Sequence, residues 1–122
     1  MNKELSIIIP VYNTPLNILD RTFKSIDSDL VDIIIINDGS NLETKKYVER
    51  FSKPRSNVKL VNQSNQGAAM ARKNGLDYLS TKYFTFVDCD DVSHVDKLLK
   101  LLNKVKTFDS KIGNGIFIFK NN

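Results

Sequence analysis

The stretch Ile33-Ile34-Ile35-Ile36-Asn37-Asp38-Gly39-Ser40 decides the fold, because a run of β-branched residues passes directly into a tight polar turn. Such continuous apolar runs are typical of strands that are buried on both faces, as in parallel sheets. Gly39 suits the tight turn, and Ser40 with Glu43 three residues later forms a capping box. The stretch therefore predicts one strand–loop–helix unit.

The same unit recurs along the chain. Apolar runs followed by a polar loop and a segment with helical periodicity lie at Leu5–Ile9, Ile33–Ile36, Val58–Val61 and Tyr83–Val87. Right-handed crossovers between such strands place helices on both faces of the sheet. We therefore expect an α/β fold with a largely parallel central sheet flanked by helices. Residues Gly115–Phe119 look like one more strand.

The expected helices carry start signals and apolar stripes. Thr14 is the expected N-cap of the first helix with Pro15 at its first position, and the last helix opens at Ser93 with Asp96 three residues on. The second helix ends before Pro54. The stripes expected to face the core are Leu16, Leu19, Phe23 and Ile26; Thr44, Tyr47, Val48 and Phe51; and Val95, Leu98, Leu99, Leu102 and Val105.

Composition favours one globular domain over residues 1–122, because 41% hydrophobic and 26% charged residues suffice for a single core. No apolar run has the length of a membrane span, and no signal-peptide core is visible, so the expected location is cytoplasmic, at most peripheral to the inner face of the membrane. The single cysteine, Cys89, agrees with a reducing compartment. The net charge of +4 is mild and its lysines are scattered, which gives nucleic-acid binding little support and leaves anionic small ligands.

The segment Phe86-Val87-Asp88-Cys89-Asp90-Asp91 places three carboxylates where the fourth expected strand ends. Carboxylates two residues apart point the same way at a strand end, so Asp88 and Asp90 are candidates to share one hard divalent ion and a phosphate-bearing ligand. The alternative is a solvated turn whose Asp side chains cap the next helix. His94 is expected to be solvated and is left out of the site.

All strand-to-helix loops of such a sheet emerge at one edge, and ligands bind in the crevice outside the carboxyl ends of the strands. Neither the turn nor the cap requires Asp38, which makes it a candidate to accept from a base N–H or a ribose hydroxyl, with an Asx-turn as the alternative. Pro10 ends the first strand, and Tyr12 is a candidate to stack on a nucleobase or else to pack on the next loop.

Arg72 lies in a segment rich in small residues. A row formed by Ala68, Arg72, Gly75 and Leu79 predicts that Arg72 is on the helix face that meets the sheet and is largely buried. A buried guanidinium needs an anionic partner, for which Asp38, Asp88 and a ligand phosphate are the candidates. A purely structural Arg–Asp pair is the alternative.

The segments S-I-I-I-P-V-Y-N, I-I-I-I-N-D-G-S, N-Q-G-A-A-M-A-R-K-N-G-L and F-V-D-C-D-D occur in the order and approximate spacing of family 2 glycosyltransferases. The chain resembles the nucleotide-sugar-binding half of that family from about Ser6 to Leu102. The resemblance implies a Rossmann-like GT-A nucleotide-diphospho-sugar transferase fold. It also implies inverting transfer of a sugar, commonly from a UDP-sugar, to a saccharide or glycoconjugate acceptor in polysaccharide or glycoconjugate synthesis.

Carried over by the resemblance, Pro10, Val11 and Tyr12 line the nucleoside pocket. Asp38 binds the base, and Arg72 lies beside the uridine. These roles belong to the family and are expectations for this chain.

By the same resemblance Asp88 faces the ribose or the metal, and Asp90 holds Mn²⁺ or Mg²⁺ against the diphosphate. Two departures from the family are visible. The segment between Ser25 and Val31 is shorter than usual, and no Asp or Glu follows Asp109 to act as the general base that inverting transfer needs.

We therefore expect a truncated chain that keeps donor binding, lacks the acceptor half and its catalytic base, and has negligible turnover. A competing hypothesis is a non-catalytic nucleotide-sugar binding module that acts with a partner chain through its exposed last strand. The exposed edge of that strand also predicts self-association of this chain. A nucleotidyltransferase is a third hypothesis. It is weakened because no Gly-rich phosphate loop with a lysine follows the first strand.

Overall fold

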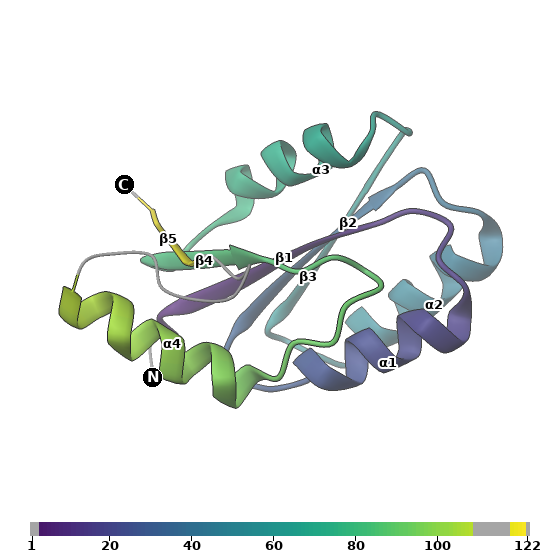
Figure 1. Ribbon diagram of the computed structural model, residues 1–122. Coiled ribbons are helices and arrows are strands. Elements are labelled where there is room, and N and C mark those ends of the chain that lie inside the picture. The colour runs from purple at the N-terminus through teal and green to yellow at the C-terminus, as the bar shows by residue number, and fades with distance from the viewer. Residues whose placement is uncertain (1–2, 109–117, 122) are drawn as a thin grey trace.

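The computed structural model describes residues 3–108 and 118–121, which form one sheet with helices on both faces (Figure 1). The sheet is five-stranded, with strand order β3-β2-β1-β4-β5. The strands are β1 (Leu5–Val11), β2 (Asp32–Asp38), β3 (Val58–Gln63), β4 (Tyr83–Phe86) and β5 (Ile118–Lys120). Strands β1 to β4 run parallel and β5 runs antiparallel to β4, so the expected largely parallel α/β fold is confirmed.

Of the helices in the described residues, three pack on one face of the sheet and one on the other, as Figure 1 shows. The first group is α1 (Leu16–Ile26), α2 (Leu42–Ser52) and α4 (Val95–Phe108). The opposite face carries α3 (Ala68–Gly75), followed by the short 3₁₀ turn η1 (Leu76–Tyr78). Among these helices none is both long enough and apolar enough to cross a membrane.

Alternate residues of the central strands supply the two cores. Ile7 and Ile9 pack with the buried side chains of α1, α2 and α4, whereas Ile8 packs with Ala71 of α3. A Cβ on Gly75 would lie 2.6 Å from Cγ2 of Ile8, so the glycine lets α3 approach the sheet closely. Both faces of β1 are therefore buried, which explains its continuous apolar sequence.

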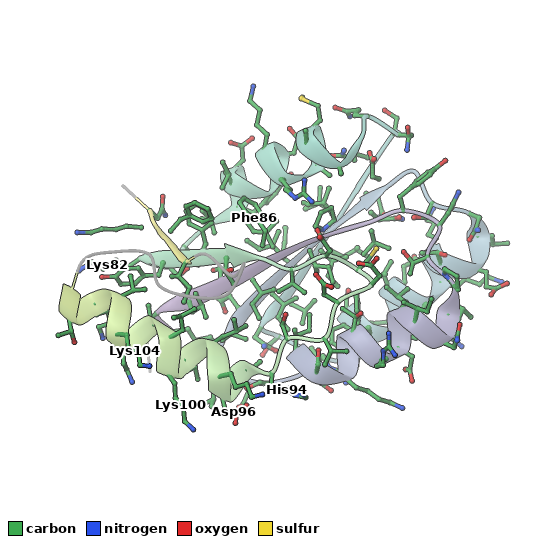
Figure 2. All side chains as sticks on the ribbon, viewed as in Figure 1. Lys82, Phe86, His94, Asp96, Lys100 and Lys104 are labelled. Carbon is green, nitrogen blue, oxygen red and sulfur yellow. The ribbon has the colours of Figure 1, made fainter. Side chains whose placement is uncertain are left out.

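The apolar stripes of the helices mostly point inward as expected. On α4, Val95, Leu98 and Leu102 are buried, and Leu99 is half-buried. Lys100 and Lys104 of α4 point away from the sheet (Figure 2). His94, at the start of this helix, is exposed, as expected.

Two of the expected helix starts lie too early in the sequence. The N-cap of α1 is Pro15 and makes no side-chain cap bond, because the hydroxyl of Thr14 bonds elsewhere, to the carbonyl of Tyr12 and to the sulfur of Cys89. Helix α4 begins at Val95 rather than at Ser93. Boundaries of this kind depend on tertiary contacts that local sequence does not report.

The expected capping box of α2 is also wrong. Asn41 is the N-cap and its side chain accepts from the backbone N–H of Thr44, 2.9 Å away. The hydroxyl of Ser40 donates instead to the carbonyl of Val11 and accepts from the N–H of Asn13. Ser40 therefore joins two loops at the carboxyl edge of the sheet.

The last expected strand is found in part. Strand β5 pairs with β4 through Ile118, Phe119 and Lys120, and Ile118 is buried. Residues 115–117 of the expected strand lie outside the described residues.

Two polar side-chain pairs connect α1 and the residue after it with α2 and the segment after it. The Tyr47 hydroxyl donates to Oδ1 of Asp20 at 2.7 Å. The Arg55 guanidinium donates to both carboxylate oxygens of Asp27, at 2.8 and 2.7 Å, and stacks 4.1 Å over the ring centroid of Phe51. These hydrogen bonds from Arg55 hold the pKa of Asp27 below its ordinary value of 3.8, against the opposing effect of partial burial.

The Asp27–Arg55 pair predicts a pH-dependent loss of stability. Because the pKa of Asp27 is lowered by folding, its contribution is complete above pH 3.8 and is lost as the pH falls through the folded-state pKa. Arg55→Met should lower the free energy of unfolding by at most about 1 kcal/mol at pH 7, since the pair is partly exposed, and this deficit should shrink as the pH falls below 3.8. Urea unfolding at several pH values measures it, with Lys45→Met as the control for loss of one positive charge. A deficit that stays constant with pH would mean that Arg55 acts only through Phe51, by stacking on its ring and by donating to its carbonyl at 2.8 Å.

Candidate functional site

The carboxyl edge of the sheet opens between β1 and β4, where the strand order reverses direction. Carbonyls of Glu4 and Ile8 accept bonds from the β4 side, so the nitrogen of Pro10 also faces that side. Pro10 has no N–H to donate, and pairing between β1 and β4 ends at Ile8 and Phe86. Strand β1 and the segment that follows β4 therefore separate beyond Ile8 and leave a crevice.

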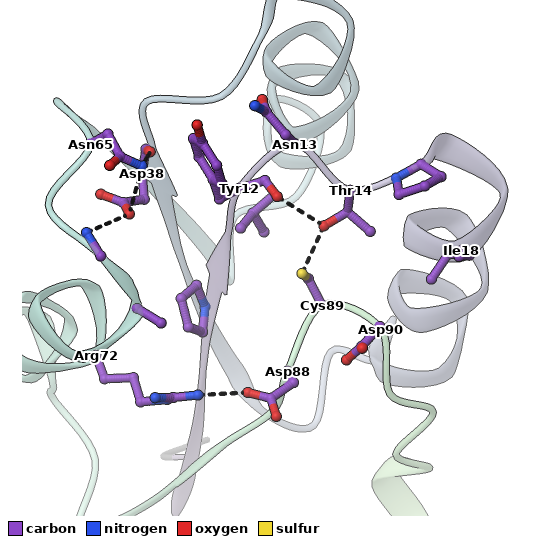
Figure 3. A pocket seen from close by; sticks show the side chains of 15 residues that line it. Tyr12, Asn13, Thr14, Ile18, Asp38, Asn65, Arg72, Asp88, Cys89 and Asp90 are labelled. Carbon is purple, nitrogen blue, oxygen red and sulfur yellow. Dashed lines mark hydrogen bonds and ion pairs between the residues drawn. The ribbon is translucent and has the colours of Figure 1, made fainter.

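A cavity of about 720 Å³ occupies this crevice (Figure 3). Its volume is in the range of pockets that hold small molecules and cofactors. The lining residues are Pro10, Val11, Tyr12, Asn13, Thr14, Pro15, Ile18, Asp38, Asn65, Gly67, Ala68, Arg72, Asp88, Cys89 and Asp90. All seven residues proposed from the sequence as donor or metal contacts thus line one cavity, whereas their individual roles stay predictions.

Asp38 is buried, with 2% of its surface exposed, and its carboxylate organises the loop after β3. Oδ1 accepts from Nε2 of Gln63 at 2.9 Å and from the backbone N–H of Gln66 at 2.8 Å. Oδ2 accepts from Nδ2 of Asn65 at 3.3 Å and from the backbone N–H of Gly67 at 3.0 Å. These four donors match the acceptor capacity of an ionised carboxylate.

Gly39 lets the two loops come together beside Asp38. Its φ is +73°, a left-handed conformation that side chains other than glycine rarely adopt, and an added Cβ would lie 2.7 Å from the backbone nitrogen of Asn65. The tight turn expected at Gly39 is therefore also a point of close backbone approach.

Arg72 pairs with Asp88, as the sequence analysis allowed. Its Nη2 lies 2.8 Å from Oδ1 of Asp88 (Figure 3). The expectation of a largely buried Arg72 is wrong, because 38% of its side chain is exposed. The residues of α3 that are buried against the sheet are Ala71 and Gly75. Gly75 was expected on this face, whereas Ala68 is exposed and Ala71 takes the inward position that was expected for Arg72.

The carboxylates of Asp88, Asp90 and Asp91 gather beside this ion pair. One oxygen from each lies within 4.8 Å of the others, and all three residues are exposed. Oxygen ligands bind Mg²⁺ at about 2.1 Å and Ca²⁺ at about 2.3–2.6 Å, so oxygens this close fit around a single hard cation. Asp91 adds a third oxygen donor to the two proposed from the sequence.

Tyr12 lines the cavity with much of its ring exposed. Its surface is 51% exposed, and Figure 3 shows its ring between Asp38 and Thr14. The next residue, Asn13, has a φ of +45°, and its Oδ1 accepts from the backbone N–H of Asn41 at 2.6 Å. The loop after β1 is thus held from α2 while the Tyr12 ring stays accessible.

The chain matches the glycosyl transferase family 2 over residues 6–122. It therefore belongs to that family. The match covers the cavity and the acidic cluster, and it agrees with the resemblance drawn from the sequence segments.

Two curated relatives illustrate the similarity. Glycosyltransferase GlyA of Streptococcus pneumoniae is 30% identical over 94% of this chain and 17% of its own length. GalNAc(5)-diNAcBac-PP-undecaprenol beta-1,3-glucosyltransferase of Campylobacter jejuni is 34% identical over 83% of this chain and 34% of its own length. The chain thus spans only a minor part of these family members.

A solved structure shows the same fold. The mannosyltransferase PcManGT of Pyrobaculum calidifontis, in complex with GDP-Man and Mn²⁺, aligns with a TM-score of 0.72 over 86% of this chain and 33% of its own, at 18% identity. The GT-A type of fold expected from the sequence is confirmed by such neighbours.

Several cavity residues were not identified from the sequence. Asn65 donates to Asp38, which lies 27 positions earlier in the sequence. Thr14 forms a hydrogen bond with Cys89, which lies 75 positions later. The polar segment N-Q-S-N-Q-G at the expected edge was the available signal for Asn65. For Thr14, its position before Pro15 predicted a helix N-cap and not a hydrogen bond to Cys89.

The Asp38 network predicts local loosening in Asp38→Asn. The variant replaces one acceptor oxygen by an NH₂ group that faces N–H donors, so the backbone amides of Gln66 and Gly67 should exchange hydrogen at least about tenfold faster in the ligand-free chain. Amide exchange followed by NMR measures this effect. Asp77→Asn, an exposed carboxylate on η1, is the matched control. Unchanged exchange at both amides would show that the Asp38 carboxylate does not hold this loop.

Proposed function

We propose that this chain binds the nucleotide-sugar donor of an inverting family 2 glycosyltransferase, with a UDP-sugar as the donor and a divalent cation at the acidic cluster. The observation that carries the proposal is the cavity that joins the Tyr12 ring to the carboxylates of Asp88 and Asp90. One end of this cavity offers an aromatic face, and the other offers oxygen ligands for a cation. A nucleoside diphosphate has complementary parts in the same order.

The nucleoside is proposed to lie against Pro10, Val11 and Tyr12. Tyr12 offers an exposed ring for stacking, and the buried Pro10 and Val11 form an apolar floor. Asp38 lines this end of the cavity and holds the Asn65–Gly67 loop next to it. A base N–H that reached the carboxylate would share an oxygen that already accepts two bonds.

The diphosphate is proposed to lie between Arg72 and the acidic cluster. Carboxylates alone would repel phosphate, so a cation held by Asp88 and Asp90, with Asp91 as a further oxygen donor, is needed to reverse the local charge. Bound there, Mn²⁺ or Mg²⁺ would neutralise charge that develops on the diphosphate leaving group. The Arg72 guanidinium, 38% exposed and held by Asp88, is available to donate to the ribose or a phosphate oxygen.

The proposal assigns donor binding, and not the complete transfer reaction, to this chain. Transfer also needs a general base placed at an acceptor hydroxyl, which is worth about a hundredfold or more in rate. We propose that a saccharide or glycoconjugate is the acceptor, by analogy with the glycosylated lipid carrier in the name of the Campylobacter relative. The non-catalytic binding module remains the alternative function, and a test of turnover with acceptor separates the two.

The metal site predicts that nucleotide binding depends on Asp90. Asp90→Asn should weaken UDP binding in the presence of Mn²⁺ at least tenfold, about 1.4 kcal/mol, because an amide oxygen is a weaker and uncharged ligand. Titration calorimetry with UDP, GDP and ADP, with Mn²⁺ and with a chelator, measures the effect and the base preference. Asp96→Asn, at an exposed residue in the first turn of α4 that does not line the cavity, is the control. Equal UDP affinity in Asp90→Asn and the unsubstituted chain would remove the metal assignment.

The stacking role of Tyr12 gives a second prediction. Tyr12→Ala should weaken UDP binding by about 1–3 kcal/mol, the range of base–aromatic stacking, while Tyr12→Phe should bind nearly as well because it keeps the ring. The same titrations compare the two variants. If Tyr12→Phe lost as much affinity as Tyr12→Ala, the hydroxyl rather than the ring would make the contact.

A further inference from the structure

The acidic loop, defined as residues 88–93, is tied to α1 by two hydroxyl groups. Thr22 is fully buried, and its Oγ1 donates to the carbonyl oxygen of Cys89 at 3.0 Å. Oγ of Ser25 accepts from the backbone N–H of Ser93 at 3.1 Å and donates to the carbonyl of Thr22 at 2.6 Å. One helical turn of α1 therefore holds the loop near its start and at its end.

The carbonyl held by Thr22 belongs to the peptide unit between Cys89 and Asp90. Because a peptide unit is planar, fixing its carbonyl direction restricts the direction in which the Asp90 side chain leaves the backbone. On the other side of Cys89, Asp88 is held by Arg72 at 2.8 Å, and its carbonyl accepts from the N–H of Asp91 at 3.0 Å. Backbone hydrogen bonds and the Arg72–Asp88 pair thus set the relative placement of the three carboxylates. The carboxylates of Asp90 and Asp91 are not part of these contacts.

Formation of α1 does not require the hydrogen bond from the Thr22 hydroxyl to the Cys89 carbonyl. A threonine within a helix commonly donates to the carbonyl four residues earlier, and a valine would fill the same buried position without any polar group. The hydroxyl instead reaches a residue 67 positions away in the sequence. Among the described residues that line the cavity neither Thr22 nor Ser25 occurs, so any effect they have on a ligand acts through the loop.

We propose that Thr22 and Ser25 are positioning residues that hold Asp88 and Asp90 in the arrangement that receives one divalent cation. This inference rests on the proposed function, because it concerns the same metal site. Residues that orient metal ligands from behind typically change metal affinity about 10–100-fold when they are replaced. Thr22 would act on the loop near its start, and Ser25 on its end.

The test combines two measurements on variants of the 122-residue chain. Mn²⁺ affinity in the presence of UDP is measured from the EPR signal of free Mn²⁺, and amide exchange at Asp91 and Ser93 is measured by NMR without metal. Thr22→Val and Ser25→Ala should each weaken Mn²⁺ binding about tenfold and speed exchange in the loop. Thr22→Ser removes a buried methyl group but keeps the hydroxyl, so it should lower the melting temperature while keeping Mn²⁺ affinity.

A matched control lies at the amino-terminal edge of the sheet, just before β4 begins. Thr81 is buried, and its hydroxyl bonds to that of Ser6 at 2.6 Å, so Thr81→Val loses a buried hydroxyl of the same kind. It should lower the melting temperature and leave Mn²⁺ affinity unchanged. Because Ser25 is only half-buried, Ser25→Ala keeps the test decisive if Thr22→Val does not fold.

The outcomes separate this inference from the function on which it rests. If the unsubstituted chain binds no Mn²⁺ with UDP, the proposed function and this inference both fail. If it binds Mn²⁺ and Thr22→Val or Ser25→Ala binds equally well, this inference alone is overturned, whether or not loop exchange changes. Weaker Mn²⁺ binding in Thr22→Ser equal to that in Thr22→Val would also overturn it, because the hydroxyl would then be irrelevant.

Discussion

The early end of the β1–β4 ladder is the constraint on which the site depends. Beyond Ile8, the next β1 nitrogen facing β4 belongs to Pro10, which cannot donate a hydrogen bond, and β4 itself ends at Phe86. The chain after β4 is therefore free to leave the sheet and present Asp88 and Asp90 at the opening. A continuous ladder at this point would close the crevice that the proposed ligand needs.

Around this opening, hydrogen bonds from polar groups hold the loops in place. Asp38 gathers the loop after β3 through four donors, and Ser40 joins the loops after β1 and β2. Two hydroxyls of α1 hold the acidic loop from behind. This arrangement leaves the Tyr12 ring and the carboxylates exposed, with their backbones fixed, as expected of a site that is formed before its ligand arrives.

The sequence predicted those features that depend on local pattern or on topology. Parallel strands and the edge at which their loops meet follow from the alternation of apolar runs and helices, and adjacency alone brought Asp88 and Asp90 together. Features that depend on tertiary competition were missed. Thr14 and Ser40 look like helix caps, but contacts across the edge use their hydroxyls. On α3, Gly75 faces the sheet as expected, but Ala71 rather than Arg72 does so one turn earlier, because eight residues form too short a helix for periodicity to fix its face.

The central claim is that a nucleotide and a divalent cation bind together at the carboxyl edge between β1 and β4. Paramagnetic broadening of backbone NMR signals by Mn²⁺, in the presence and absence of UDP, tests it most directly. The account predicts broadening centred on residues 88–91 and extending to Pro10 and Tyr12, with no effect at Asp32 and Lys59 at the opposite edge. Broadening centred on any other surface, or none when UDP is present, would contradict it.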